Sequence, residues 1–442
     1  MKETYRIGRI IVGAAVALTA AQSLAPVYAQ SAGQAETFVS KEEYLKLQKE
    51  HEQLMKEVRE LKSQVQGSAQ STGTPPPAAA ETQVSAGHNA RSSDPLTLSR
   101  YVFPGSSQVL LTGYGTAGFS ALSHTDPSFD AQFNPMLLWK VSDKLLFEGE
   151  LELELEDGET STKLEQAHLS YLATDWITFD AGKFLNPMNS FVERYHMGWV
   201  NRLPDKPLAV YDGLLPETYV GAQVRGGLPI GTSKVNYSAF VGNAPKVING
   251  VGADDDAGTL GMFEWDNFGN EGGRIASGGH LGFLPVAELE IGYGLHYSGL
   301  ADSSDHVLIQ SADLNYVRDS DALRGLLRLN AQWVWSHMGS GTYDNNGTPL
   351  AFQNNRNGGY TQLAYRATKA NFDFLRRVEA VFRYDCLQQK NTPVGYDENR
   401  YTFGLNYWLT PKTVFKVAYQ LDDKSKGATD NSGVLVQFAT GF

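Results

Sequence analysis

The sequence predicts an all-β fold, a transmembrane antiparallel β-barrel of about 16 strands that follows an N-terminal α-helical coiled coil. Residues 108–442 carry apolar side chains at every second position over many short segments. The connections between these segments are alternately short and long, and Tyr and Phe each occur 21 times in the chain. A strand with lipid on one face and water on the other needs such alternation, with aromatic residues at the membrane boundaries.

The N-terminus predicts export from the cytoplasm. A basic segment from Lys2 to Arg9 precedes the apolar run from Ile10 to Ala21, and Val27-Tyr28-Ala29 has the small-residue pattern of a signal peptidase site. The apolar run is shorter than the roughly 20 residues of a membrane-spanning helix. We therefore expect a signal peptide over residues 1–29, followed by a short segment at 30–39.

Residues 40–66 predict a coiled-coil helix. Ser40 and Glu43 form a capping box at its start. Apolar or weakly polar residues then recur alternately three and four positions apart, at Tyr44, Leu47, His51, Leu54, Val58, Leu61 and Val65. This heptad spacing is typical of helices that self-associate, and a single amphipathic helix lying on another surface is the alternative. Residues 67–98, rich in Pro, Ala and Ser, predict a partly extended linker.

The barrel is expected over residues 99–442. Its periodic segments are centred near residues 114, 137, 150, 168, 181, 223, 239, 279, 293, 312, 330, 363, 381, 404, 418 and 437. Tight turns are expected at 141–144, 173–175, 284–286 and 409–412, and long loops at 186–217, 245–273, 339–357 and 390–398. An even number of strands places both ends of the barrel on the short-turn side, which is the periplasm in a bacterial outer membrane. The coiled coil is therefore expected in the periplasm.

Several short segments resemble the phosphate-selective porin O/P family. They are Phe147 to Leu153, Leu164 to Tyr171, Gly182-Lys183-Phe184 with Pro187, Val220 to Val224, and Phe240 to Asn243. The resemblance implies a homotrimer of barrels in which the third extracellular loop, here Asn186 to Pro216, folds into the lumen. It also implies the passage of phosphate or other anions.

Strand alternation places charges of both signs inside the barrel. The pore-lining candidates are Glu148, Glu150, Glu152, Glu154, Arg225, Arg324, Arg328, Arg377, Arg383 and Lys416, and the candidates in the constricting loop are Arg194, Arg202, Asp205 and Lys206. Rings of like charge select ions, and a phosphate channel needs clustered arginine forks. This lumen is mixed and leans acidic, so weak ion selectivity without a strong preference for phosphate is expected. Alternatively, opposite charges pair across the wall and only hold its shape.

These observations favour a passive diffusion channel for small hydrophilic solutes or ions in the bacterial outer membrane. The alternative is a structural protein that tethers the membrane to the cell wall through the coiled coil. The sequence carries no recognisable catalytic set, and neither a cofactor nor a resident metal is expected; Asp254-Asp255-Asp256 is interpreted as a solvated acidic loop. A net charge of −12 argues against nucleic acid as a partner.

Overall fold

The computed structural model describes residues 108–442 except 157–158, 212, 253–258, 301–304, 390–392, 394 and 427. The expected signal peptide, N-terminal segment, coiled coil and linker lie outside the described residues. So do the first residues of the expected barrel, 99–107, and the acidic run at 254–256. Among the described residues no helix is long and apolar enough to cross a membrane.

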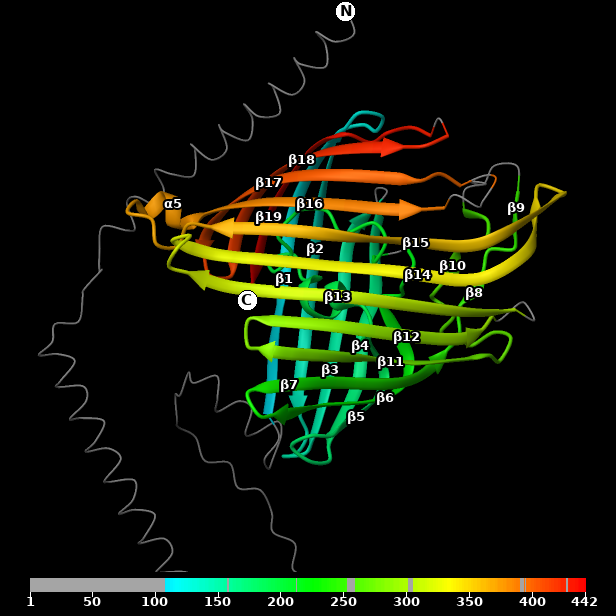
Figure 1. The fold of residues 1–442 in the computed structure, drawn as a ribbon, viewed down its shortest axis with the longest axis horizontal. Coiled ribbons are helices and arrows are strands. Elements are labelled where there is room, and N and C mark those ends of the chain that lie inside the picture. Colours follow the sequence, from blue (N-terminus) through cyan, green and yellow to red (C-terminus); the bar gives the residue numbers. More distant parts are fainter. Residues whose placement is uncertain are drawn as a thin grey trace, which may run out of the picture. The chain divides into compact units, whose positions relative to one another are not determined.

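Within the described chain, 16 strands form a closed antiparallel barrel. The strands are β1 (Gln108–Leu122), β2 (Ser128–Lys140), β3 (Leu145–Glu156), β4 (Glu159–Leu172), β5 (Thr178–Leu185), β6 (Thr218–Ile230), β7 (Ser233–Asn243), β11 (Ile275–Val286), β12 (Leu289–Gly299), β13 (His306–Ser320), β14 (Gly325–Asn345), β15 (Thr348–Arg366), β16 (Val378–Gln388), β17 (Glu398–Thr410), β18 (Thr413–Lys424) and β19 (Gly433–Gly441). In Figure 1 the yellow and orange strands β13 to β17 run across the view in front of the cyan strands β1 and β2.

The first and last strands close the sheet. Tyr114 of β1 lies opposite Asn134 of β2 on one side and opposite Gly441 of β19 on the other. Every other barrel strand pairs with its neighbours along the chain, so backbone hydrogen bonding is satisfied around the whole circumference. A closed barrel leaves no unpaired strand edge, which is what a bilayer requires of a β-structure.

The two faces of the wall differ in polarity. On β17, Phe403 and Leu405 are 51% and 60% exposed, whereas Thr402 and Asn406 are 0% and 2% exposed. The same alternation recurs around the barrel, with large exposed apolar side chains outside and mostly polar ones inside. An apolar exterior on a closed barrel is the surface that hydrocarbon solvates, so the described residues form a barrel of the transmembrane type.

All 16 segment centres predicted from the sequence fall inside barrel strands. The loop expected at 339–357 is wrong, because β14 and β15 continue through this region as one hairpin. The two strands join at Asn346 and Gly347, whose φ angles of 50° and 78° suit the two-residue turn that Asn-Gly favours. The tight turn expected at 284–286 lies slightly later, because β11 extends to Val286.

The connection between β7 and β11 contains three very short strands. β8 (Lys246–Val247) pairs with β10 (Phe263–Glu264), and β9 (Gly250–Val251) lies parallel to the far end of β14. Two short helices complete the described structure, α4 (Ser190–Tyr195) between β5 and β6 and α5 (Asp373–Arg377) between β15 and β16. Both described ends of the barrel lie on the short-turn side, as expected.

Candidate functional site

Residues 186–217, which we call the lumen loop, connect β5 to β6 through the interior of the barrel. Arg194 forms a two-pronged ion pair with Glu290 of β12, with 2.9 Å between Nη2 and Oε1. His196 lies 3.8 Å from Glu150 of β3. The loop also receives hydrogen bonds from β17 and β18. Since these strands belong to different parts of the wall, a loop that touches them all crosses the lumen, as the family resemblance implied.

Two asparagines fix the ends of the lumen loop. Asn186 donates from Nδ2 to the carbonyl of Pro216 at 3.0 Å, which ties the start of the loop to its end. Asn189 is the N-cap of α4, and its Oδ1 accepts the Val192 N–H at 3.1 Å. An asparagine cap satisfies a backbone donor that the first helical turn leaves open. Both side chains are fully buried, so their hydrogen bonds are shielded from water.

One side of the lumen loop packs against an apolar part of the wall. Phe191 is 1% exposed, and its ring meets that of Tyr360 on β15 edge to face at 6.0 Å. Buried loop residues share this core with inward residues of neighbouring strands, among them Met188, Val192, Val210, Leu215, Ile309 and Val334. This part of the lumen is therefore filled by a hydrophobic core and is closed to water.

The acidic series on β3 faces inward but is largely paired. Glu150 is 1% exposed and accepts from Gln166 Nε2 at 2.8 Å. Glu152 is 9% exposed and accepts from Gln132. Glu148, at 30% exposed, lies 3.2 Å from His168. The sequence alone suggests a row of free carboxylates along β3. In the structure, neighbouring amide and imidazole groups contact these carboxylates, so less of their surface is open to the lumen.

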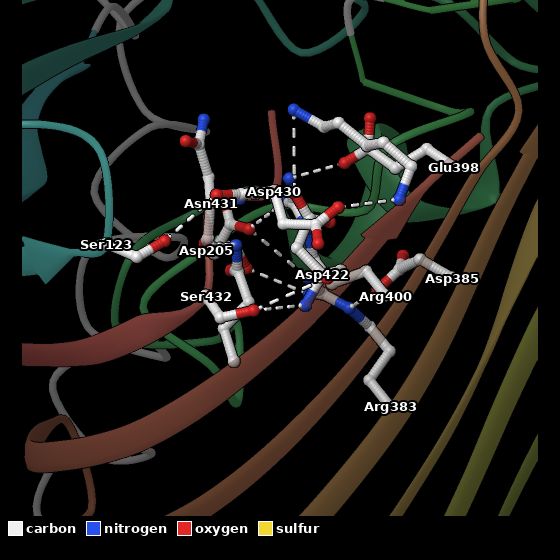
Figure 2. A network of polar contacts seen from close by, with 12 residues as sticks. Ser123, Asp205, Arg383, Asp385, Glu398, Arg400, Asp422, Asp430, Asn431 and Ser432 are labelled. Carbon is white, nitrogen blue, oxygen red and sulfur yellow. Dashed lines mark hydrogen bonds and ion pairs between the residues drawn. The ribbon is translucent and has the colours of Figure 1, made fainter. Parts of the chain in front are cut away.

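The middle of the lumen loop is held by charges, which Figure 2 shows at close range. Arg383 of β16 donates to the Asp205 carbonyl at 2.8 Å and to the Lys206 carbonyl at 3.1 Å, and it pairs with Asp385 at 2.7 Å. Arg400 of β17 pairs with the Asp205 carboxylate. We call this set the Asp205 network; it continues to Glu398 and Asp422, at 2.8 Å and 3.3 Å from Arg400.

A second group of arginines lies on the short-turn side of the lumen loop. Arg202 is 3.8 Å from Glu379 and sits over the ring of Trp408 at 4.8 Å, and Arg366 approaches the same ring at 5.5 Å. Arg202 Nη1 and Arg328 Nε have no hydrogen-bond partner among the described residues. Burial lowers the pKa of Arg202, and the neighbouring arginines reinforce this, against the opposing effect of Glu379.

Cavities border the lumen loop on both of its sides. On the long-loop side, a cavity of about 440 Å³ is lined by the end of the loop, by Lys163 and by residues 263–269. On the short-turn side, a cavity of about 10 Å³, roughly the space of one water, is lined by Tyr195, Arg202 and Arg328 among others. Only the cavity on the long-loop side is therefore large enough to admit a small solute. No group of three or more metal-ligating side chains occurs in the described part of the chain.

Most of the sequence-predicted charges lie inside the barrel. Glu148, Glu150, Glu152 and Glu154 are inward residues of β3, and Arg328, Arg383 and Lys416 are inward residues of β14, β16 and β18. Arg225 pairs with Asp180 at 2.8 Å, and Lys416 donates to Gln437 at 2.7 Å. Of the loop candidates, Arg194, Arg202 and Asp205 contact the wall, and Lys206 lies 3.7 Å from the centre of the Tyr211 ring.

Two candidates were placed wrongly. Arg324 lies in the turn between β13 and β14, with a φ of 50°, and its guanidinium reaches Lys369 and Asn371 outside the strands. Arg377 ends α5, where the backbone is helical, so the period of two no longer predicts its direction. Both side chains lie at the short-turn end of the barrel.

Sequence reasoning missed Arg400 and His196. Arg400 directly precedes Tyr401, which shares its parity with the apolar Phe403 and Leu405 of the segment centred near residue 404, so the alternation already predicts an inward Arg400. His196 carries no such signal, because its position depends on how the lumen loop folds. Burial lowers the pKa of His196, but the Glu150 carboxylate and the Val192 carbonyl together outweigh this effect and leave that pKa raised.

No model of a known protein family matches the chain, and no curated protein matches it. Solved structures of similar fold include the outer membrane channel DcaP of Acinetobacter baumannii, with 14% identity over 76% of this chain and 97% of that chain and a TM-score of 0.48. OmpF of Salmonella typhi has 12% identity over 76% and 97%, with a TM-score of 0.48. An anion-selective porin from Comamonas acidovorans has 12% identity over 76% and 100%, with a TM-score of 0.45. Similarity at this level does not establish the phosphate-selective porin O/P family.

Proposed function

We propose that this protein is an outer-membrane porin, a passive diffusion channel for small hydrophilic solutes and ions. The observation that carries the proposal is the asymmetry of the lumen loop, which is sealed by apolar packing on one side and bordered by partly exposed charges elsewhere. Glu148, Arg194 and Asp205 are each about 30% exposed inside a barrel whose exterior is apolar. Solutes pass the loop along these charged side chains.

Weak ion selectivity is part of the proposal. Arg202 lies beside Glu379, Arg400 pairs with Asp205, and Arg194 pairs with Glu290, so neither sign dominates the inner wall. Partly exposed arginines such as Arg194 favour brief contacts with anions, including phosphate, because a guanidinium offers a planar fork to an oxyanion. The family resemblance supports the same preference. Assembly as a homotrimer, with the coiled coil in the periplasm, completes the proposed arrangement.

The experiment is conductance of the purified protein in planar lipid bilayers. We expect stepwise channels with a small reversal potential in a potassium chloride gradient. Replacing Arg202 and Arg328 with Gln should lower the chloride-to-potassium permeability ratio about two- to fivefold, which corresponds to up to about 1 kcal/mol for the two charges together. The matched control is Arg318→Gln, an exposed arginine of β13 next to the inward Val317, which should leave the ratio unchanged.

The same measurement tests the structural alternative. A barrel that only anchors a periplasmic coiled coil should give little or no conductance. That outcome would overturn the proposed channel and leave tethering to the cell wall, through residues 40–66, as the function to examine.

A further inference from the structure

The two misplaced arginines lie beside an unusual connection at the short-turn end of the barrel. The other connections at this end contain two to five residues between the strand bounds, whereas the one between β15 and β16 contains residues 367–377 and includes α5. Figure 1 shows α5 projecting at the end of the barrel where β15 gives way to β16. A helical insertion is not needed to join two adjacent antiparallel strands, since a two-residue turn is sufficient.

This connection exposes three large apolar side chains. Phe372, Phe374 and Leu375 are 71%, 62% and 45% exposed, and α5 contains no buried residue. Scattered apolar residues on a surface need no explanation, but a contiguous group of this size usually marks contact with a partner or a membrane.

The apolar group is continuous with the lipid-facing surface of the barrel. The ring of Phe374 stacks on Tyr407 of β17, with 5.5 Å between the ring centres. Tyr407 belongs to the same outward series as Phe403 and Leu405, which are 51% and 60% exposed. The helix therefore lies against the outer face of the wall, at the edge of the membrane-spanning surface.

Basic residues border the apolar group. Arg324 Nη2 donates at 3.1 Å to both the Lys369 carbonyl and Asn371 Oδ1, which braces the connection. Arg377 Nη1 donates to the Leu409 carbonyl at 3.4 Å. Lys369 pairs with Asp319 and Asp321, and Arg376 pairs with Asp373. By contrast, neither Arg324 nor Arg377 has a carboxylate within ion-pair distance in the part of the chain that is described.

We propose that residues 367–377, together with Arg324, form a phospholipid-binding foot. Phe372, Phe374 and Leu375 enter the acyl region of the leaflet on the short-turn side, and Arg324 and Arg377 hold the phosphate of an anionic phospholipid. Aromatic side chains favour the membrane interface, and a guanidinium fork matches phosphate geometry. Continuity with the lipid-facing wall singles out lipid over a soluble partner. The inference rests on the proposed function only in requiring that the barrel span a membrane.

The first test measures depth in the bilayer. The variant Phe374→Cys carries a nitroxide label and is reconstituted in vesicles of phosphatidylcholine and phosphatidylglycerol; the parent chain, whose Cys386 is buried, serves as the blank. Collisions with oxygen should dominate at position 374. Collisions with a water-soluble nickel chelate should dominate at the control Asp143→Cys, an exposed turn at the same end of the barrel. Equal nickel accessibility at the two positions would overturn the foot, whether or not the protein conducts ions.

The second test measures headgroup binding by native mass spectrometry. We expect the unmodified protein to retain phosphatidylglycerol in preference to phosphatidylcholine. The double variant Arg324→Asn/Arg377→Gln should bind phosphatidylglycerol about tenfold more weakly, with phosphatidylcholine unaffected. Asparagine is chosen at 324 because it tolerates the positive φ there. Lys144→Gln, in another turn at this end, is the control and should bind as the parent does. Unchanged retention of phosphatidylglycerol in the double variant would overturn the arginine assignment.

Discussion

The lumen loop is held differently at its two attachments. Against β13 to β15 it buries Phe191, which is 1% exposed, in a continuous apolar core. Against β16 to β18 it presents Asp205, which is 31% exposed, to two arginines. The first attachment excludes water and tolerates little change, because a cavity in a packed core is costly. At the second, Asp205 is partly hydrated, and each arginine also pairs with another carboxylate, Arg383 with Asp385 and Arg400 with Glu398 and Asp422, so the loss of the Asp205 contact leaves neither cation unpaired. We therefore expect the apolar attachment to determine the stability of the loop and the charged attachment to influence ion selectivity.

The largest expected effect comes from the apolar attachment. Phe191→Ala should lower the free energy of unfolding by about 3–4 kcal/mol, because it removes a buried ring from between Tyr211 and Tyr360. Urea titration of the protein in lipid vesicles measures this. The matched control is Phe129→Ala on the outer face, where the side chain is 83% exposed and the loss should be small. Equal losses for the two variants would mean that the loop is not packed as described.

A smaller effect, on selectivity more than on stability, is expected from the charged attachment. Asp205→Asn removes the carboxylate that faces Arg383 and Arg400 and leaves both cations near the passage. The chloride-to-potassium permeability ratio should rise about two- to fivefold, with unfolding little changed. Reversal potentials in a salt gradient measure it, with Asp143→Asn, in an exposed turn, as the unaffected control. If Asp205→Asn destabilised the protein as much as Phe191→Ala does, the two attachments would not differ in the way described.

The smallest effect concerns pH and the contact between His196 and Glu150. Burial lowers the pKa of His196, and Lys206 lowers it further, but Glu150 and the Val192 carbonyl together raise it by more, so the pKa in the folded protein is above the ordinary value of 6.5. The charged contact therefore stabilises the fold fully below about pH 6.5 and is lost as pH rises through the raised value. The urea midpoint of the parent should fall over this window more than that of His196→Gln. Parallel pH profiles for the two proteins would exclude a charged His196.

The strands of the barrel wall could be predicted from the sequence because their pattern is local. Each strand repeats apolar and polar residues with a period of two, and the pattern survives whatever the loops do. The prediction failed where the backbone left that period, at Arg324 in a turn and at Arg377 in a helix. It also failed at 339–357, where polar composition suggested a loop although Asn346-Gly347 carried the signal of a hairpin.

The site was less predictable than the wall because it depends on contacts distant in sequence. Arg194 meets Glu290, and Arg400 meets Asp205, across separations that no local pattern encodes. Strand alternation predicts that the glutamates of β3 face inward. It does not predict their amide partners on β2 and β4, because those depend on the register between the strands. Register explains why a stripe that is acidic in sequence is only partly available in the lumen.

The most direct test of the account is a cross-link between the lumen loop and the wall. A β-carbon at Gly198 would lie 3.8 Å from that of Ala439 on β19, the usual separation in a disulfide, and 2.3 Å from the Thr116 methyl group. The variant Gly198→Cys/Ala439→Cys, with Thr116→Ala to make room, should therefore form a disulfide under mild oxidation. It should migrate faster than its reduced form on denaturing gels, and Gly198→Cys alone should not. A folded, heat-modifiable barrel that forms no such bond would contradict a loop that crosses the lumen.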